Sequence, residues 1–290
     1  MKLNSAMTGH KPTLTVAMEQ NFPASQRIFV DELAPKLFSD SNRFWINITK
    51  YSFIRNLIVN MSEKAMRGGW SFFLIRKRFI QERLLEKFRN KEVDQILNLG
   101  AGLDTVLYRF KEFSKTPCFE ADQSVSMENK KARIERVMGA IPSHITQLSI
   151  DLEQDNVEAI LSAAGYDESK KTFLILEATS QYLNSDAIDR LFKFYKKAKS
   201  GSYLAFTYIP KDFLEGTQLY GQKFMYKMTV ENGLWKFGLN PKEVEHFLNK
   251  YDYDLISDHT YESLHDEYVK PTGRKLGDLE IERIVFAVKR

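Results

Sequence analysis

The chain has 290 residues, of which 43% are hydrophobic and 28% are charged, and its formal net charge is +4. This is an ordinary globular composition with room for one large or two ordinary domains, and so slight and dispersed a basic excess indicates no nucleic-acid partner. The single cysteine, Cys118, excludes an internal disulfide framework, and no Cys/His spacing indicates a zinc site, so no metal is expected.

The sequence contains neither a recognisable targeting segment nor a membrane-spanning one. Residues 1–6 lack the apolar run of a signal peptide, and nowhere do 18 apolar residues follow one another. We therefore expect a soluble cytoplasmic protein without a membrane partner. The sequence does not determine the oligomeric state.

Helices are expected in the first 90 residues, which we interpret as a helical cap on the core. Residues 1 to about 20 show no clear period, whereas apolar residues from Ile28 to Phe38 recur at helical spacing, which predicts a helix from Ser25. A second helix is predicted over 46–65 and a third over 72–88, with a break at residues 68–69 between them. The third helix carries four cations, which is usual for a solvated helix face: Arg76, Lys77, Arg78 and Arg83.

The segment 95–110 changes period within a few residues. An apolar run over 96–99 predicts a buried strand, Gly100-Ala101-Gly102 predicts a turn, and apolar residues from Leu103 to Phe110 recur at helical spacing. In open α/β sheets ligands bind beyond the carboxyl ends of the strands, and glycines there let a ligand lie against the backbone. The turn is therefore a candidate nucleotide-type pocket, although any strand-to-helix turn can use glycine for its backbone angles alone.

Two residues after the turn narrow the class of ligand. The third glycine of the dinucleotide fingerprint is replaced by Thr105, and Asp104 opens the expected helix. A pyrophosphate at a helix N-terminus is disfavoured by a nearby carboxylate. A cationic ligand tolerates that carboxylate, and S-adenosylmethionine carries a sulfonium and an ammonium but no phosphate.

The next two predicted strands each end in an acid. The strand over 117–121 is followed by Asp122, which lies 22 residues after Gly100, where a carboxylate suits the hydroxyls of a ribose. Glu120 is the alternative, and Asp122 could instead cap a helix near Ser124. The strand over 145–150 is followed by Asp151-Leu152, a pair that suits adenine, although Asp151 could instead cap a turn.

The second half of the chain continues the alternation of strands and helices. The strand over 172–177 is the most continuous apolar run, and an acid at its end, Glu177, is costly unless it meets water, a partner or a cation. Further strands are expected over 202–209, 253–258 and 281–288, with helices over 188–198 and 241–250. The aromatic insertion over 211–240 is interpreted as a substrate lid, or else as an extra helix covering the sheet.

The string Leu99-Gly-Ala-Gly-Leu-Asp-Thr-Val-Leu-Tyr-Arg109 resembles the LGAGxDTxxYR signature of the leucine carboxyl methyltransferase family, which includes polyketide and peptide O-methyltransferases. The resemblance implies an α/β fold with the Rossmann-like, seven-stranded sheet of class I methyltransferases, whose last strand is antiparallel. It also implies S-adenosylmethionine as cofactor, bound by a core over 91–290 that carries the lid.

The resemblance assigns roles to individual residues. Arg76, 24 residues before Gly100, matches the arginine that holds the carboxylate of the methionine part, with Arg78 as the alternative. Glu177 would face the cofactor and Tyr182 would form the mouth of the site, although Ala178 replaces the family's glycine. The residues expected to bind the cofactor are Arg76, Gly100, Gly102, Asp122, Asp151, Leu152 and Glu177.

The methyl acceptor is less constrained than the cofactor. A carboxylate acceptor needs only a cation to orient it, and Arg274 or Arg109 could supply one, whereas a hydroxyl acceptor usually needs a base, for which His259 and His265 are candidates. The catalytic residue stays unassigned. The length and the apolar lid favour a small natural product of polyketide or peptide type over the C-terminal leucine of a protein.

Two interpretations from other classes compete with this one. A nicotinamide oxidoreductase shares the strand–turn–helix opening, but Thr105 and Asp104 depart from its pattern. A catalytically silent scaffold would keep the fold and lose the ligands. Binding of S-adenosylhomocysteine would exclude the first, and turnover would exclude the second.

Overall fold

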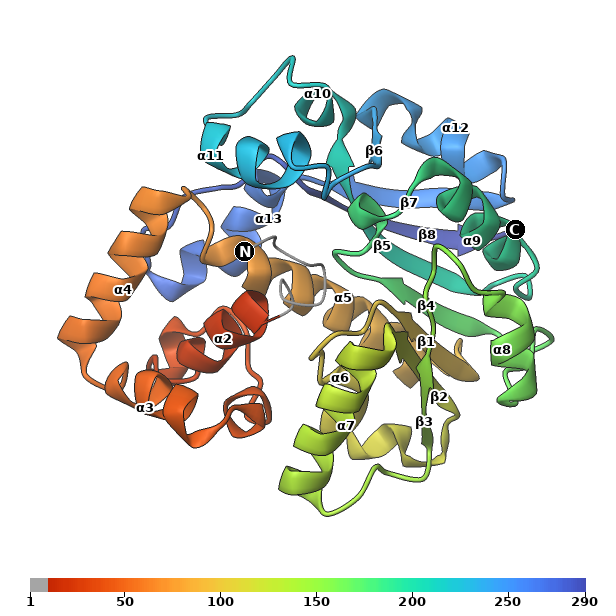
Figure 1. The fold of residues 1–290 in the computed structure, drawn as a ribbon, viewed down its shortest axis with the longest axis horizontal. Coiled ribbons are helices and arrows are strands. Elements are labelled where there is room, and N and C mark those ends of the chain that lie inside the picture. The colour runs from red at the N-terminus through yellow and green to blue at the C-terminus, as the bar shows by residue number, and fades with distance from the viewer. Residues whose placement is uncertain (1–9) are drawn as a thin grey trace.

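The computed structural model describes residues 10–290 and is built around one mixed eight-stranded sheet (Figure 1). Seven strands follow the order β3-β2-β1-β4-β5-β8-β7, and the short β6 pairs with β5. Strands β1, β2, β3, β4 and β5 are parallel to one another, whereas β8 runs antiparallel to β5 and β7. The strands are β1 (Gln95–Leu99), β2 (Cys118–Asp122), β3 (Ile145–Ser149), β4 (Thr172–Leu176), β5 (Tyr203–Pro210), β6 (Gly238–Leu239), β7 (Tyr253–His259) and β8 (Arg283–Lys289).

This topology confirms the predicted α/β sheet, including its antiparallel last strand. The seven predicted strands fall within two residues of the observed ones at each end. The continuous apolar runs of β1, β4 and β5 mark strands that are buried along their whole length. The two-residue β6 was not predicted, since so short a pairing leaves no alternation in the sequence.

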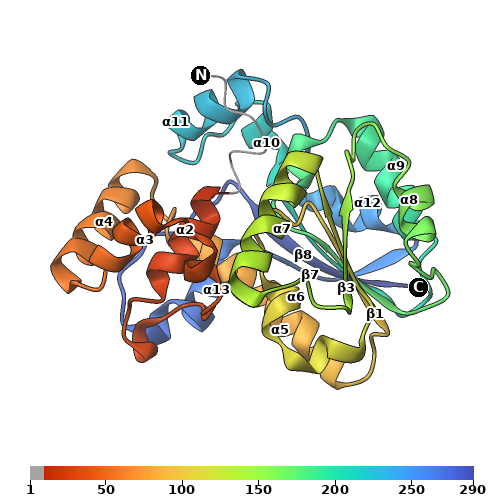
Figure 2. The ribbon, with the colours of Figure 1, turned by 60° about the horizontal axis from the view of Figure 1, so that its bottom comes forward.

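Two apolar cores lie on the two faces of the sheet, and successive residues of each strand alternate between them. On β4, for example, Phe173 and Ile175 belong to one core, whereas Leu174 and Leu176 belong to the other. Helices α5, α6, α7 and α13 cover the first core, and α8, α9 and α12 cover the second (Figures 1 and 2). Their bounds are α5 (Ser71–Arg89), α6 (Val106–Arg109), α7 (Ser124–Met138), α8 (Val157–Ala163), α9 (Ser185–Lys196), α12 (Val244–Asn249) and α13 (Tyr261–Tyr268).

The N-terminal region is helical, as expected, but its helices differ from the predicted ones. Residues His10–Glu19 form α2, in the stretch where no period was found; the first nine residues lie outside the described part. The helix predicted over 46–65 is two helices, α3 (Asp40–Ile48) and α4 (Ser52–Ala65). The third predicted helix corresponds to α5.

The helix predicted from Ser25 is wrong. Residues 27–33 form neither helix nor strand and lie between the short 3-10 turns Ala24–Gln26 and Ala34–Leu37. Backbone amides of this segment donate to side chains: Glu19 accepts from Ile28, and Asp31 accepts from Leu33 and Ala34. The amides therefore have partners without an intrahelical ladder, and the apolar side chains are buried at irregular rather than helical intervals.

The insertion over 211–240 folds as short helical pieces: α10 (Lys211–Leu214), α11 (Lys223–Tyr226) and a π-helical turn over Lys227–Glu231, followed by β6. Three of its rings are buried, those of Phe213, Trp235 and Phe237. The insertion is therefore packed on the core, and its function as a lid, like the division into a cap over 1–90 and a core over 91–290, stays a prediction. Across residues 10–290 there is no helix with both the length and the apolar character needed to cross a bilayer.

A buried ion pair joins β2 to α7. Lys130 Nζ lies 2.6 Å from Glu120 Oε2, and both side chains are inaccessible to solvent. Tyr108 and Gln147 also donate to Glu120 Oε1. Burial and the neighbouring Glu120 carboxylate raise the pKa of Tyr108, so the phenol keeps its proton and donates.

Removing one partner of this pair leaves a buried charge without a counterion. We expect Lys130→Met to lower the free energy of unfolding by about 3–5 kcal/mol, and the double variant E120L/K130M to recover most of the loss. Urea unfolding of the three proteins measures both effects. A single variant as stable as the wild type, or a double variant no better than the single one, would contradict the prediction.

Candidate functional site

The glycine turn between β1 and α6 has two glycines with different surroundings. Gly100 and Gly102 adopt positive φ values of +72° and +43°. A Cβ atom at Gly100 would lie 2.0 Å from Thr179 Oγ1, so the close approach of Thr179 requires this glycine. A Cβ atom at Gly102 would meet no atom within 4 Å, so the backbone there faces open space.

Asp122 lies beside this open stretch of backbone. Its Oδ2 accepts a hydrogen bond of 2.7 Å from the amide of Gly102, and its Oδ1 accepts one from the amide of Gln123. The structure thus brings Asp122 and Gly102 together, as the predicted ribose site requires. The alternative, Glu120, is enclosed with Lys130 and has no access to a ligand.

The helix after the turn is shorter than predicted, because α6 spans only Val106–Arg109. Asp104 lies two residues before the first residue of α6, and its Oδ1 accepts a hydrogen bond of 2.7 Å from the amide of Val106. This carboxylate stands where a pyrophosphate would bind in a dinucleotide site. The geometry agrees with a cationic ligand at this turn.

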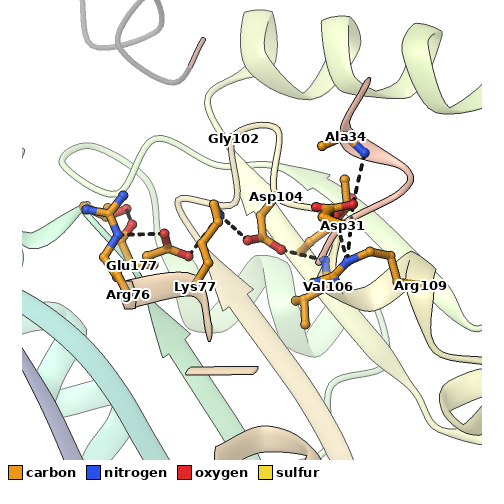
Figure 3. Close-up of polar contacts among 12 residues, drawn as sticks. Asp31, Ala34, Arg76, Lys77, Gly102, Asp104, Val106, Arg109 and Glu177 are labelled. Carbon is orange, nitrogen blue, oxygen red and sulfur yellow. Dashed lines mark hydrogen bonds and ion pairs between the residues drawn. The ribbon is translucent and has the colours of Figure 1, made fainter. Parts of the chain in front are cut away.

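A cluster of charged side chains lies beside the turn, and Figure 3 shows Arg76, Lys77, Asp104 and Glu177 of this cluster. Arg76 of α5 contacts Glu177 Oε1 through Nε at 2.7 Å and Glu282 Oε1 through Nη1 at 2.9 Å. Lys77 Nζ lies 2.5 Å from Asp104 Oδ2 and 3.2 Å from Glu177 Oε2. We call Arg76, Lys77, Asp104, Glu177 and Glu282 the ion cluster.

The ion cluster holds three acids and two bases, so it carries a formal charge of −1. Burial by itself would raise the pKa of Asp104, but the Lys77 ammonium holds that pKa well below its usual range. Burial would lower the pKa of Lys77, and the carboxylates of Asp104 and Glu177 raise it instead. Asp104 and Lys77 therefore stay ionised near neutral pH.

The structure settles which arginine meets Glu177. Arg78 instead pairs with Glu82 and lies 4.6 Å over the ring of Tyr268, so Arg76 is the arginine of the site. Its function in cofactor binding stays a prediction.

Two members of the ion cluster, Lys77 and Glu282, were not recognised as site residues from the sequence. Glu282 directly precedes the last apolar strand, and an acid there needs a cation, which was the available signal. Lys77 neighbours Arg76 and carried no distinguishing signal.

The turn after β4 is strained at Ala178. This residue has a φ of +52°, which costs a residue with a Cβ roughly 1–2 kcal/mol, and its amide donates to Thr207 Oγ1 at 2.8 Å. The family's glycine at this position fits the same backbone. The replacement therefore keeps the left-handed turn that Glu177 needs, at a cost in stability.

Asp151 and Leu152 follow β3, as predicted, and Leu152 is buried. Asp151 Oδ1 accepts from the amide of Glu153 at 2.9 Å, so the carboxylate caps a turn, the alternative that the sequence left open. The adenine assignment stays a prediction.

Tyr182 lies in a short 3-10 turn, Ser180–Tyr182, and is half-buried. The insertion is attached next to it, because the amide of Lys236 donates to the carbonyl of Gln181 at 2.7 Å. Tyr182 and the expected lid are therefore neighbours.

The two cations predicted for the acceptor are engaged elsewhere. Arg274 Nη1 lies 2.7 Å from Glu19 Oε1, and the guanidinium lies 3.7 Å over the ring of Phe22. Arg109 donates to Thr105 Oγ1 and to the carbonyl of Val30. Both side chains fasten the N-terminal segment, so the assignment of Arg274 to the substrate stays a prediction that its contacts do not support.

The two histidines considered as bases have structural contacts. His259 packs its ring edge-on against Phe79, and burial lowers the pKa of His259 below its usual range. His265 Nε2 lies 3.9 Å from Asp278 Oδ1. These contacts distinguish neither histidine as a base.

The two glycines of the turn are expected to respond differently to alanine. Gly100→Ala should lower the free energy of unfolding by about 2–5 kcal/mol, because it adds both left-handed strain and a collision with Thr179. Gly102→Ala should cost only the strain, about 1–2 kcal/mol. Equal losses in urea unfolding would show that the open space at Gly102 is filled in solution.

The ion cluster predicts a pH dependence of stability. Because the folded pKa of Asp104 is depressed, its contribution is complete above the unfolded pKa, near 4, and is lost as the pH falls. The difference in unfolding free energy between the wild type and Asp104→Asn should be constant above about pH 5 and shrink by about 1.4 kcal/mol per unit below pH 4. Urea unfolding at several pH values tests this, and a constant difference would contradict it.

Relatives of known sequence share part of this chain. An S-adenosyl-L-methionine-dependent methyltransferase, provisionally so named, from Mycolicibacterium paratuberculosis is 30% identical over 164 residues, which are 56% of this chain and 51% of that protein. One of the same provisional name from Mycobacterium avium is 33% identical over 132 residues, 45% and 41% of the two chains. The chain thus spans about half the length of the curated relatives it matches.

Solved structures share its fold. A provisionally named methyltransferase from Thermobifida fusca has a TM-score of 0.58 at 18% identity, covering 94% of this chain and 97% of its own. A DUF574 family protein from Streptomyces avermitilis has a TM-score of 0.55 at 10% identity, covering 95% and 97%.

A family model described as leucine carboxyl methyltransferase matches residues 10–196. The match covers well over half of the chain and includes the glycine turn, Asp122 and Glu177. The resemblance inferred from the sequence is thereby confirmed, and the chain belongs to the leucine carboxyl methyltransferase family.

Proposed function

We propose that this protein is an S-adenosylmethionine-dependent O-methyltransferase that acts on a carboxyl or hydroxyl oxygen of a small natural product of polyketide or peptide type. The observation that carries the proposal is the open backbone at Gly102, with Asp122 bonded to it and the ion cluster beside it. The names of the relatives support the same cofactor.

The charge of the site fits the charge of this cofactor. S-adenosylmethionine has two cationic groups and one carboxylate, so it is a net cation, and the ion cluster carries a formal charge of −1. Opposite charges attract strongly in a partly buried site. A dinucleotide, with its anionic pyrophosphate, would instead meet Asp104.

Different residues of the chain are assigned to different parts of the cofactor. We assign Asp122 to the ribose hydroxyls, Asp151-Leu152 to the adenine, and Arg76 to the carboxylate of the methionine part. Glu177 would accept from the ammonium, for which it would exchange part of its contact with Lys77. When bound, S-adenosylmethionine supplies an electrophilic methyl group on a sulfonium.

The protein's contribution to the transfer is position and the exclusion of water. Holding an acceptor oxygen in line with the methyl group supplies up to about 7–11 kcal/mol of the barrier. We assign Tyr182 and the neighbouring insertion over 211–240 to the cover over the acceptor, which is supported by the hydrogen bond from the amide of Lys236 to the carbonyl of Gln181.

The matching family model favours a second candidate, methylation of the C-terminal leucine carboxyl of a protein. A carboxylate acceptor needs no base, which agrees with the structural contacts of His259 and His265. The aromatic insertion over 211–240 favours the small acceptor.

Cofactor binding is tested by calorimetry with S-adenosylhomocysteine and, separately, NAD. The wild type should bind S-adenosylhomocysteine at one site and not bind NAD. Asp122→Asn should weaken binding roughly 10- to 150-fold, since hydrogen bonds to a charged group are worth about 1.5–3 kcal/mol. Asp186→Asn, the same change at an exposed position of α9, is the matched control and should bind like the wild type.

The acceptor is identified by incubation with methyl-labelled S-adenosylmethionine. Small carboxylic acids, small phenols and a peptide that ends in leucine are offered separately. Labelling of small molecules supports the proposal, whereas labelling of the peptide alone establishes the second candidate. NAD binding without S-adenosylhomocysteine binding would overturn both.

A further inference from the structure

Exposed apolar side chains gather at one end of the molecule, on α3, on α4 and at Tyr51 in the connection between these helices. In the part of the chain that the structure describes, eleven large hydrophobic side chains are exposed, and six of them lie within residues 44–61. Their exposed fractions run from 50% to 79%. We call this set the outer apolar surface: Phe44, Trp45, Tyr51, Phe53, Leu57 and Met61.

Helix α4 carries its apolar stripe on the side that faces away from the protein. Phe53, Leu57 and Met61 follow one another at four-residue spacing and share one face. The opposite face holds the buried Arg55 and Val59, and Arg55 Nη1 donates to the carbonyl of Asn21 at 2.9 Å.

The two helices lie at the end of the molecule away from the sheet in both views (Figures 1 and 2). The rings of Phe44 and Trp45 contact each other edge-on, with 5.7 Å between their centroids, and both residues are more than half exposed. Exposed apolar side chains gathered at one end of a protein in this way indicate an interaction site.

All of the charged residues within the segment 43–62, which carries the outer apolar surface, are basic. Residues 43–62 include no aspartate or glutamate, and the exposed cations Arg43 and Lys50 flank the rings, with Lys64 one turn beyond Met61. The nearest following acid, Glu63, accepts from the backbone amides of Gly68 and Gly277. The surface is therefore aromatic and aliphatic at its centre and basic at its edge.

We propose that the outer apolar surface docks on a lipid bilayer with anionic headgroups. Tryptophan, tyrosine and phenylalanine favour the boundary between headgroups and acyl chains, and lysine and arginine beside them favour anionic lipids. A second copy of the chain is a poorer partner, because a two-fold interface would bring the exposed Lys50 and Lys64 of one copy close to the same cations of the other.

This proposal replaces the expectation, drawn from the sequence, that no membrane is a partner. That expectation depended on the lack of a spanning segment, and a surface that lies in the headgroup region needs none. The proposal does not depend on the proposed enzymatic function, since it uses no residue of the site.

Trp45 provides a direct reporter. The chain has three tryptophans, and Trp70 and Trp235 are only 3% and 9% exposed, so a change of solvent at Trp45 dominates the fluorescence response. Flotation is measured with vesicles of phosphatidylcholine alone and of equal parts phosphatidylcholine and phosphatidylglycerol. The full chain should float with the mixed vesicles, its emission should shift to shorter wavelength, and added salt should weaken the binding. Trp45→Phe should float without the shift.

Substitutions separate the apolar and the charged contributions. Phe53→Glu should weaken binding roughly tenfold or more, whereas Phe224→Glu, at a similarly exposed ring on α11, should not. The double variant K50E/K64E should reduce binding to the mixed vesicles to the level seen with neutral ones. Because K50E/K64E changes only exposed side chains, it tests the proposal even if Phe53→Glu fails to fold.

Several outcomes would overturn the proposal. One is no flotation with either vesicle, and another is equal binding to neutral and mixed vesicles. A third is a dimer in sedimentation velocity that Phe53→Glu abolishes, which would assign the surface to a second copy. Flotation of Phe53→Glu at the wild-type level would show that α4 is not the contact.

Discussion

The buried guanidinium of Arg76 connects the parts of the structure on which the site depends. It joins α5 to the ends of two strands, since Glu177 follows β4 and Glu282 precedes β8. Lys77, the next residue of the same helix, extends the contact to Asp104 beside the glycine turn. Five charges can be buried together only because each has an oppositely charged partner within hydrogen-bonding distance. The packing of α5 on the sheet and the shape of the site are therefore set by one arrangement.

The sequence was informative where local chemistry decides the structure. Buried strands require apolar runs, and the sharp turn after β1 requires glycine, so the sheet, Gly102 and Asp122 were predicted from neighbouring residues. It was less informative where side chains from distant segments decide. The apolar residues after Ser25 have helical spacing. The backbone amides of this stretch nevertheless donate to the side chains of Glu19 and Asp31, and residues 27–33 form no helix. The position of Glu282 before an apolar strand indicates that it needs a cation, but its partner Arg76 lies 206 positions away and cannot be named from the local sequence.

The outer apolar surface illustrates a related limit. A periodic apolar stripe identifies a helix and its amphipathic character, but not the direction in which the stripe faces. On α4 the stripe faces outward, because Arg55 lies on the inner side and donates to the carbonyls of Asn21, just after α2, and Thr49, just after α3. Buried polar side chains thus orient the N-terminal helices, whereas apolar residues orient the strands.

The distance along the chain between Arg76 and Glu282 has a consequence for synthesis in the cell. During translation α5 emerges from the ribosome long before β8, because Arg76 and Glu282 are separated by 206 positions. Until β8 inserts between β5 and β7, the nascent chain holds Arg76 without one of its two counterions. The ion cluster can therefore be complete only after Glu282 has been translated, and a product interrupted before that residue would lack this counterion.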